Sequence, residues 1–233
     1  MARMFGHISG RYDRLNGIMS GGRHHAWRRL AADMAVTGTQ GPALDVATGT
    51  GDFALELTNR PEVSEVIGLD FTPEMLPLAR DKTRERQMAD HAGYAVADAH
   101  NLPLPDDHFV CATVGFGVRN FVDLPKALDE MVRVLRPGGR LVILEIVRLE
   151  GLGVVGKLFP LYFRYVTPWI GAIFGGNREA YTYLPESVQG FLSATQLSAM
   201  MRRAGLQNVQ HRKLALGTVA IHVGIKAGAT SRG

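Results

Sequence analysis

The sequence Ala43-Leu44-Asp45-Val46-Ala47-Thr48-Gly49-Thr50-Gly51 decides how the first half of this chain folds. Its apolar start predicts a short buried strand, which leads into a turn that contains two glycines. A second apolar stretch follows and ends at Asp70. Glycines let the backbone of such a turn approach a bound molecule, and a carboxylate at the end of the next strand is suited to grip two ribose hydroxyl groups. The spacing therefore predicts a site for a cofactor that contains a nucleoside.

The composition is typical of a globular enzyme. The chain has 233 residues, of which 46% are hydrophobic and 21% charged, so we expect one domain with a large core. The formal net charge is +4 at pH 7, but its largest basic cluster lies on one short predicted helix, at 23–29. A nucleic-acid-binding protein would spread such charge along a stripe, so we expect no nucleic-acid partner.

The sequence favours a cytoplasmic protein. Its single cysteine, Cys111, can form no intrachain disulfide, and the N-terminus lacks the apolar core of a signal peptide. The most apolar part of the chain, 151–176, has its longest uncharged stretch at 165–174. That stretch is far shorter than the roughly 20 residues that cross a bilayer. We expect this segment either to lie on the inner face of the membrane or to line an apolar pocket.

Strands and helices alternate through the first two thirds of the chain, which predicts a parallel sheet covered on both faces. Thr72 is suited to begin a helix, with Pro73 at its first position, and Pro137-Gly138-Gly139 is suited to end one. The predicted strands are 42–47, 65–70, 94–98, 109–114 and 140–147, and the predicted helices between them are 52–59, 72–87 and 124–135.

The two ends of the chain follow other patterns. Residues 3–36 have a helical pattern with a glycine-rich break, and 151–190 are rich in glycine, proline and aromatic residues. A helix at 195–204 precedes a predicted hairpin, whose strands at 209–215 and 219–225 flank Gly217. We expect a single domain, 1–233, made of a helical N-terminal cap (1–40), a cofactor-binding core (41–147), a substrate lid (151–190) and a C-terminal helix and hairpin (195–226).

Three carboxylates decide between two cofactors. The glycine-rich turn also fits the dinucleotide pattern G-x-G-x-x-G/A, with Asp70 at the right distance for NAD. Asp45, however, lies four residues before Gly49, where a carboxylate would repel a pyrophosphate but suits a ligand with an ammonium and a sulfonium. Asp98 ends the third predicted strand and can accept a hydrogen bond from an adenine amino group. The three acids favour S-adenosylmethionine over NAD.

The assembled pattern resembles the class I methyltransferases. Four of their features have counterparts in the same order: the first motif, the ribose-binding acid, the adenine-side motif and the turn before the fifth strand. The matching positions are Asp45-x-x-x-Gly49-x-Gly51, Asp70, Asp98-Ala99 and Arg136-Pro137-Gly138-Gly139.

This resemblance implies a Rossmann-like α/β fold with S-adenosylmethionine as cofactor. The sheet is then mostly parallel, ends in an antiparallel hairpin and carries helices on both faces. No metal ion is expected. Gly115 departs from the pattern, since some relatives have a serine there, and can offer the cofactor only backbone groups. The candidate cofactor-binding residues are Asp45, Thr48, Gly49, Gly51, Asp70, Asp98, Ala99 and Gly115.

Outside the cofactor core the chain resembles a narrower family, the C-methyltransferases of ubiquinone and menaquinone biosynthesis. The resemblance covers residues 4 to 226 and implies methylation of a ring carbon of a polyprenyl quinol. Overall similarity favours demethylmenaquinol, with the benzoquinol of the ubiquinone branch as the alternative. The three matching stretches are Tyr12-Asp13-x-Leu15-Asn16-x-x-x-Ser20-x-Gly22-x-x-x-x-Trp27-Arg28, Phe116-Gly117-Val118-Arg119-Asn120 and Tyr181-Thr182-Tyr183-Leu184-Pro185-Glu186-Ser187-Val188.

Three further functions stay open at this point: methylation of another small molecule, an NAD-linked oxidoreductase, and a cofactor-binding scaffold of a quinone-biosynthesis assembly. The positions of Asp45 and Asp98 speak against the oxidoreductase. A soluble phenolic substrate would leave the apolar segment 151–176 harder to explain.

Methylation of an aromatic carbon suggests the catalytic candidates Arg119, Asn120 and Tyr181. Loss of a phenolic proton raises the electron density at the ortho carbon, so the enzyme has to bind the phenol, favour its anion and exclude water. Arg119 and Asn120 follow the fourth predicted strand at its carboxyl end, where ligands bind in open α/β sheets. A guanidinium stabilises a phenolate but is a poor base, because its pKa lies above roughly 12. The structural alternatives are that Arg119 pairs with Asp123 or caps a loop, that Asn120 caps the turn before Asp123, and that Tyr181 only packs.

Two other groups of residues receive structural interpretations. Trp27, Arg28 and Arg29 are expected to form a packed helix face with solvated flanks. The apolar segment 151–176 is interpreted either as a surface for an isoprenoid tail and lipid phosphates, or as a cap that buries its own apolar face or forms a homodimer interface.

Overall fold

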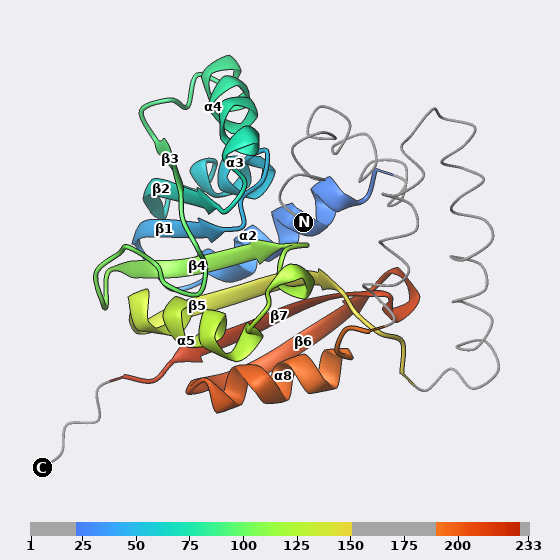
Figure 1. The fold of residues 1–233 in the computed structure, drawn as a ribbon. Coiled ribbons are helices and arrows are strands. Elements are labelled where there is room, and N and C mark those ends of the chain that lie inside the picture. The colour runs from blue at the N-terminus through green and yellow to red at the C-terminus, as the bar shows by residue number, and fades with distance from the viewer. Residues whose placement is uncertain (1–21, 151–189, 229–233) are drawn as a thin grey trace, which may run out of the picture.

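The computed structural model describes residues 22–150 and 190–228. These residues form a seven-stranded sheet in the order β3-β2-β1-β4-β5-β7-β6 (Figure 1). The first five strands are parallel, and β7 is antiparallel to both β5 and β6. The prediction of a mostly parallel sheet with a C-terminal antiparallel hairpin is confirmed. The strands are β1 (Gly41–Val46), β2 (Val63–Asp70), β3 (Ala92–Val96), β4 (Phe109–Gly115), β5 (Leu135–Ile146), β6 (Leu206–Leu214) and β7 (Val219–Lys226).

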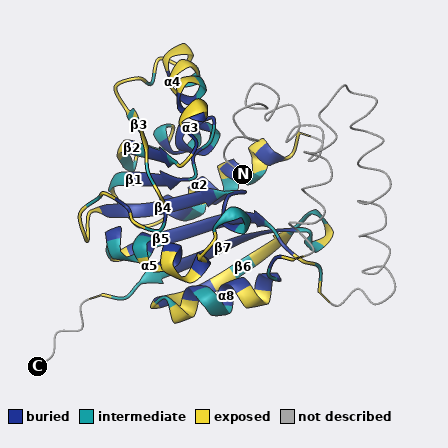
Figure 2. Cartoon of the chain, viewed as in Figure 1, coloured by how far each residue is buried: buried dark blue, intermediate teal, exposed yellow. Residues whose placement is uncertain are grey.

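Helices cover both faces of this sheet, as the alternating pattern predicts. Side chains of α2 and α3 pack with β1, β4 and β5 in one buried cluster, and those of α5 and α8 pack in a second cluster on the other face. Figure 2 shows the central strands as the most deeply buried part of the chain. The helices are α2 (His24–Val36), α3 (Asp52–Thr58), α4 (Leu76–Glu85), α5 (Leu124–Val134) and α8 (Ala194–Arg203).

The sequence of α5 explains its position. Leu124, Leu128 and Met131 recur at helical spacing on one face and are buried against the sheet. The Asp123 side chain begins the helix by accepting a hydrogen bond from the Lys126 N–H at 3.1 Å. Replacing a fully buried leucine such as Leu128 with alanine costs about 2–5 kcal/mol, so this face holds the helix in place.

Two prolines explain two of the differences between the observed elements and the predicted ones. Pro77 lies at the second position of α4, where a missing backbone N–H breaks no helical hydrogen bond. The helix therefore begins at Leu76, after a short 3-10 turn at Pro73–Met75, rather than at residue 72. Pro137 belongs to an irregularity within β5, because the pairing with β4 shifts register between Leu135 and Arg140. The fifth strand thus begins five residues earlier than predicted.

The substrate lid up to residue 189, the N-terminal signature before residue 22 and the candidate Tyr181 lie outside the described residues. The described part of the N-terminal cap is α2, which begins at His24.

Candidate cofactor site

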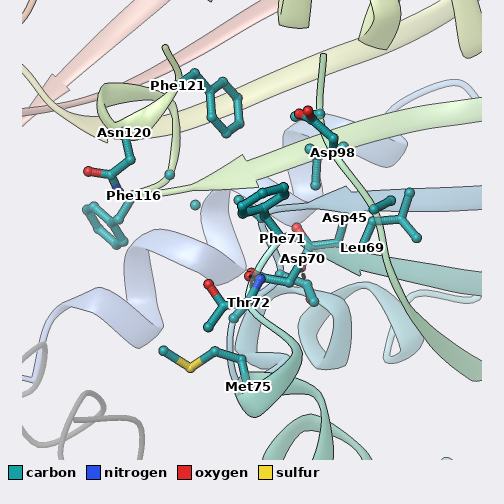
Figure 3. Close-up of a pocket in the computed structure, with 18 of the residues that line it drawn as sticks. Asp45, Leu69, Asp70, Phe71, Thr72, Met75, Asp98, Phe116, Asn120 and Phe121 are labelled. Atoms are coloured by element: carbon teal, nitrogen blue, oxygen red, sulfur yellow. Dashed lines mark hydrogen bonds between the residues drawn. The ribbon is translucent and has the colours of Figure 1, made fainter. Parts of the chain in front are cut away.

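The carboxyl ends of β1, β2, β3 and β4 open into one cavity of about 550 Å³ (Figure 3). This is the edge at which parallel α/β sheets bind their ligands. Figure 3 shows the side chains of Asp45, Asp70 and Asp98, which come from successive parallel strands, around this cavity. The predicted site residues that line it are Asp45, Thr48, Gly49, Asp70, Asp98, Ala99, Gly115 and Asn120.

Asp70 holds the glycine-rich turn in place. Its Oδ2 accepts a hydrogen bond from the Gly49 N–H at 2.7 Å, and its Oδ1 accepts one from the Thr72 N–H at 2.8 Å. Burial raises the pKa of Asp70 above its ordinary value, although the hydrogen bonds from Thr72 and Gly49 act to lower it. The Thr72 side chain and the Phe71 backbone also hydrogen-bond to the carboxylate, and the group lines the cavity at the end of β2, where a ribose would meet it. This arrangement fits an acid that accepts hydrogen bonds from two ribose hydroxyls.

Asp45 lies beneath the same turn and is 1% exposed. Its Oδ2 accepts hydrogen bonds from the Thr48 hydroxyl at 2.6 Å and the Ala54 N–H at 3.1 Å, and its Oδ1 accepts one from the Thr113 hydroxyl at 2.7 Å. Burial raises the pKa of Asp45 to about 6 against the lowering effect of these bonds. Because the Thr48 hydroxyl donates to Asp45, Thr48 stabilises the floor of the cavity.

Gly51, a predicted cofactor-binding residue, is not among the residues that line the cavity. A Cβ atom at Gly51 would lie 2.9 Å from Ala79 Cβ and 2.9 Å from Tyr94 Oη. The residue also has a φ of +82°, in the left-handed region that favours glycine. Gly51 is therefore required for packing between α3, α4 and β3. Of the two glycines in the turn, Gly49, with a φ of +56°, is the one that lines the cavity.

His100 joins two parts of the cavity wall, and the sequence analysis did not single it out. Its Nε2 accepts a hydrogen bond from the Asp123 N–H at 3.2 Å, so in the neutral ring the proton is on Nδ1, which faces Asp98 Oδ1. Asp98 also accepts a bond from the His100 N–H at 2.9 Å, and these bonds lower the pKa of Asp98. The carboxylate is 49% exposed and lies at the mouth of the cavity.

Arg119 pairs with Glu145 of β5 rather than with Asp123, but it also caps the loop at Phe116, as the other structural alternative predicted. Its Nη1 donates to Glu145 Oε1 at 2.8 Å and to the carbonyl oxygen of Phe116. The Arg119 side chain is 5% exposed and is not among the cavity-lining residues. Asn120, the next residue, does line the cavity.

Arg28 lies in a different environment from the one that the sequence predicts. The predicted packed face with solvated flanks is wrong for this residue, because Arg28 is buried and lines the cavity. Its Nη1 lies 3.4 Å from Asp52 Oδ2, and its guanidinium carbon lies 5.6 Å from the centre of the Phe116 ring. Lys82 Nζ donates to the other oxygen of Asp52 at 2.7 Å. Burial raises the pKa of Asp52, but Arg28 and Lys82 outweigh it, and the net shift is downward.

Within residues 22–150 and 190–228, no helix is long and apolar enough to span a bilayer. The same described residues hold no group of three histidine, cysteine or acidic side chains that could bind a metal ion.

The side chains around the cavity fit S-adenosylmethionine. Acids at the ends of β1, β2 and β3 suit a ligand with an ammonium, a ribose and an adenine, and the backbone around Gly49 is open to the cavity. Asp45, which lies beneath the glycine-rich turn, would repel the pyrophosphate of a dinucleotide. The strand order also differs from the dinucleotide-binding order 3-2-1-4-5-6, because an antiparallel β7 lies between β5 and β6.

Comparison with known proteins gives a family and close relatives. A model of the ubiE/COQ5 methyltransferase family matches residues 1–226. Demethylmenaquinone methyltransferase of Deinococcus radiodurans is 47% identical over 223 residues, which cover 96% of this chain and 91% of that protein. The Thermus thermophilus protein of the same name is 46% identical and covers 95% of this chain and 99% of its own length. A ubiquinone/menaquinone biosynthesis C-methyltransferase UbiE from a Geobacter species is 42% identical over 224 residues.

Solved structures agree with the fold. An S-adenosylmethionine-dependent methyltransferase from Thermotoga maritima superimposes with a TM-score of 0.65 at 21% identity, covering 97% of this chain and 100% of that one. A methyltransferase from Haloferax volcanii, solved with its Trm112 activator, gives a TM-score of 0.68 at 19% identity and covers 96% of this chain and 97% of the matched one. The Rossmann-like methyltransferase fold expected from the sequence is thus confirmed.

Proposed function

The chain belongs to the ubiE/COQ5 methyltransferase family, and we propose that it methylates a ring carbon of a polyprenyl quinol with S-adenosylmethionine. The preferred substrate is demethylmenaquinol, because the relatives at 47% and 46% identity carry the name demethylmenaquinone methyltransferase. Relatives at 42% identity are named for both ubiquinone and menaquinone biosynthesis, so a benzoquinol is the second candidate.

The observation that carries this proposal is the convergence of Asp45, Asp70 and Asp98 on one cavity. S-adenosylmethionine, when bound, supplies an electrophilic methyl group to the ring carbon. In our proposal Asp70 accepts hydrogen bonds from the ribose hydroxyls and Asp98 accepts one from the adenine amino group. The backbone of Gly49, Ala99 and Gly115 completes the binding surface.

Besides the methyl donor, the reaction requires the acceptor ring to be held as a phenolate in an environment without bulk water. Asn120 lines the cavity next to the buried Arg119–Glu145 pair, and we propose that it orients the phenol or a water molecule bound to it. The ion pair supports a role for Arg119 in holding the 116–120 turn. Direct stabilisation of the phenolate by Arg119 stays a prediction, as does a catalytic role for Tyr181, which lies outside the described residues.

A polyprenyl substrate has its tail in a lipid bilayer, so we propose that the protein works from the cytoplasm at the inner face of the membrane. Segment 151–176, with its apolar residues and nearby basic ones, is the candidate contact surface. Co-sedimentation with anionic vesicles, compared with neutral ones, tests this part of the proposal.

The proposal as a whole is tested with labelled S-adenosylmethionine and two separate acceptors, a prenylated benzoquinol and a prenylated naphthoquinol. Mass spectrometry then locates the new methyl group. We expect methylation of the naphthoquinol ring carbon. Methylation of the benzoquinol alone would select the ubiquinone branch. Binding of the cofactor without transfer to either acceptor would favour the scaffold hypothesis.

A further inference from the structure

Arg28 is a buried cation in the wall of the cavity. It extends from α2, is 5% exposed, and lies beside Asp52 at the start of α3 and over the ring of Phe116. Burial of a guanidinium is costly unless charged or polar partners compensate for lost water. Asp52 is a shared partner, because Lys82 Nζ holds its Oδ1 at 2.7 Å while Arg28 lies at the longer distance of 3.4 Å from its Oδ2. Arg28 Nη1 contacts the buried His24 Nδ1 as well as Asp52 Oδ2, so a ligand in the cavity would meet Nε or Nη2 of the guanidinium.

The position of Arg28 along the cavity identifies the part of a ligand that it would meet. Figure 3 shows Phe116 well apart from Asp98, with Asp70 between the strands that carry them. An S-adenosyl ligand with its adenine at Asp98 and its ribose at Asp70 extends its amino-acid end past Gly49, toward the Phe116 side. The guanidinium lies over that ring.

The charges at this end match an amino acid. Among the described residues that line the cavity, the basic side chains of arginine and lysine are Arg28, which is buried, and Lys126, which is exposed on α5. Asp45 is a buried acid in the lining of the same cavity, and the Arg28 charge acts to lower its pKa. A guanidinium and a carboxylate at one end of a cavity are complementary to an α-carboxylate and an α-ammonium, and a planar guanidinium can bind a carboxylate through two hydrogen bonds.

We infer that Arg28 anchors the α-carboxylate of the S-adenosyl ligand and so selects ligands that retain the amino-acid group. This inference rests on the proposed function, since it assumes that the cavity binds S-adenosylmethionine. It assigns to α2 a direct part in cofactor recognition that the glycine-rich turn and the strand-end acids do not supply.

The test compares two ligands that differ only in the carboxylate: S-adenosylmethionine and its decarboxylated form, which keeps the sulfonium and the ammonium. Affinities are measured by calorimetry for the wild-type protein, Arg28→Met and Arg28→Lys. Arg28→Met retains an apolar stem, and Asp52 keeps its 2.7 Å contact with Lys82, so we expect the fold to survive. Arg29→Met, at an exposed position on the same helix, is the matched control.

We expect Arg28→Met to weaken binding of S-adenosylmethionine by about 10- to 100-fold and to change binding of the decarboxylated ligand by less than about threefold. Arg28→Lys should give a smaller loss with the same selectivity, because it keeps the charge without the planar fork. Arg29→Met should change neither affinity.

Equal losses for the two ligands, or no loss for either, would overturn the inference while leaving the proposed function intact. If Arg28→Met fails to give a cooperative thermal transition, the same comparison of the two ligands is made with Arg28→Lys. A selective loss for S-adenosylmethionine then supports the inference, and equal losses or no loss overturn it. A wild-type protein that binds neither ligand would overturn the proposed function and the inference together.

Discussion

The Arg119 guanidinium and the Glu145 carboxylate form a buried ion pair, with 2.8 Å between Nη1 and Oε1 and side chains that are 5% and 0% exposed. The same nitrogen donates to the carbonyl oxygen of Phe116, and the Arg119 N–H donates to Glu145 Oε2 at 3.3 Å. The pair therefore joins the turn at Val118–Asn120 to the end of β5. Because Phe116 and Asn120 line the cavity, the pair also sets the shape of its wall.

Removing one partner of this pair should strongly destabilise the protein. In Arg119→Ala the Glu145 carboxylate stays buried without its main partner, and such a change costs about 3–5 kcal/mol of unfolding free energy. Adding Glu145→Gln should recover about 1–2 kcal/mol, because a neutral amide is cheaper to bury than a carboxylate. Urea denaturation of both variants measures the difference. A single variant as stable as the wild type would contradict this account.

The rate of methyl transfer in Arg119 variants tests whether Arg119 contacts a phenolate directly or only positions the 116–120 turn. If the guanidinium stabilises a developing oxyanion, its loss should slow single-turnover methyl transfer by about 100- to 1000-fold. Arg119→Lys should then rescue the rate only in part, while the dissociation constant of the cofactor hardly changes. Rapid-quench transfer and calorimetry on the same protein distinguish the cases. Normal transfer in a folded variant would remove Arg119 from the chemistry.

Asp70→Ala should weaken binding of S-adenosylmethionine by on the order of 100-fold, since hydrogen bonds to a charged acceptor contribute about 1.5–3 kcal/mol each. The change also removes the acceptor for the Gly49 and Thr72 N–H groups, which loosens the turn. Calorimetry measures the affinity. Asp81→Ala, which removes an exposed acid of α4 paired with Arg84, is the control and should bind normally. Unchanged affinity in Asp70→Ala would exclude the ribose role.

Cofactor binding should depend on pH through Asp45. Burial raises the pKa of this acid to about 6, and a bound ligand with an ammonium and a sulfonium favours the ionised form. The pKa is therefore lower in the complex, so affinity should rise with pH up to about 6 and then level off. Calorimetry in buffers of different ionisation enthalpy should detect release of a proton on binding at pH 5.5. Asp45→Asn should bind more weakly and without this release.

His222 should reduce stability in acid. The ring is fully buried, Nε2 donates to the Ala194 carbonyl oxygen at 3.0 Å, and burial lowers the pKa to about 4 from an ordinary value of 6.5. Between these values the unfolded chain binds the proton and the folded chain does not, so stability falls as pH decreases from 6.5 to 4. The loss is on the order of 3 kcal/mol.

The variant His222→Gln keeps a side-chain donor for Ala194 and should lose less stability over this pH range than the wild type. Subtracting the two denaturation curves isolates His222, because Asp45 acts in the opposite direction over the same interval. His91→Gln, at an exposed position, should leave the curve unchanged. Parallel curves for His222→Gln and the wild type would show that the buried ring does not control acid stability.

The strand ends could be predicted from the sequence because the signals are local. Short apolar runs bounded by glycine or an acid mark β1 and β2, and parallel strands place their carboxyl ends at one edge. The candidates Asp45, Asp70 and Asp98 follow from that rule alone. The same rule places Gly49 in the turn between strand and helix.

The contributions that the sequence analysis missed depend on packing between distant segments. Burial of Arg28 is set by α2 lying against α3 and β4, and the partner of Arg119 is 26 residues away in a neighbouring strand. Gly51 occupies a motif position that is typical of a ligand-facing glycine, yet a Cβ atom added there would face Ala79 and Tyr94. The neighbours of these three residues depend on how distant helices and strands pack together, and the spacing of apolar residues along the sequence does not predict that packing.

The place of β7 in the sheet has a consequence for synthesis of the chain. The strands that surround the cavity are complete at Ile146, but β5 acquires its second neighbour only when Lys226, 80 residues later, is available. At a translation rate of about 5–20 residues per second, the nascent chain carries an unpaired, strongly apolar β5 edge for about 4–16 seconds. An exposed edge of this kind is a template for pairing with other chains. We therefore expect aggregation of the nascent chain to be favoured until β7 is made, and a chain truncated before Val219 to keep its β5 edge unpaired by β7.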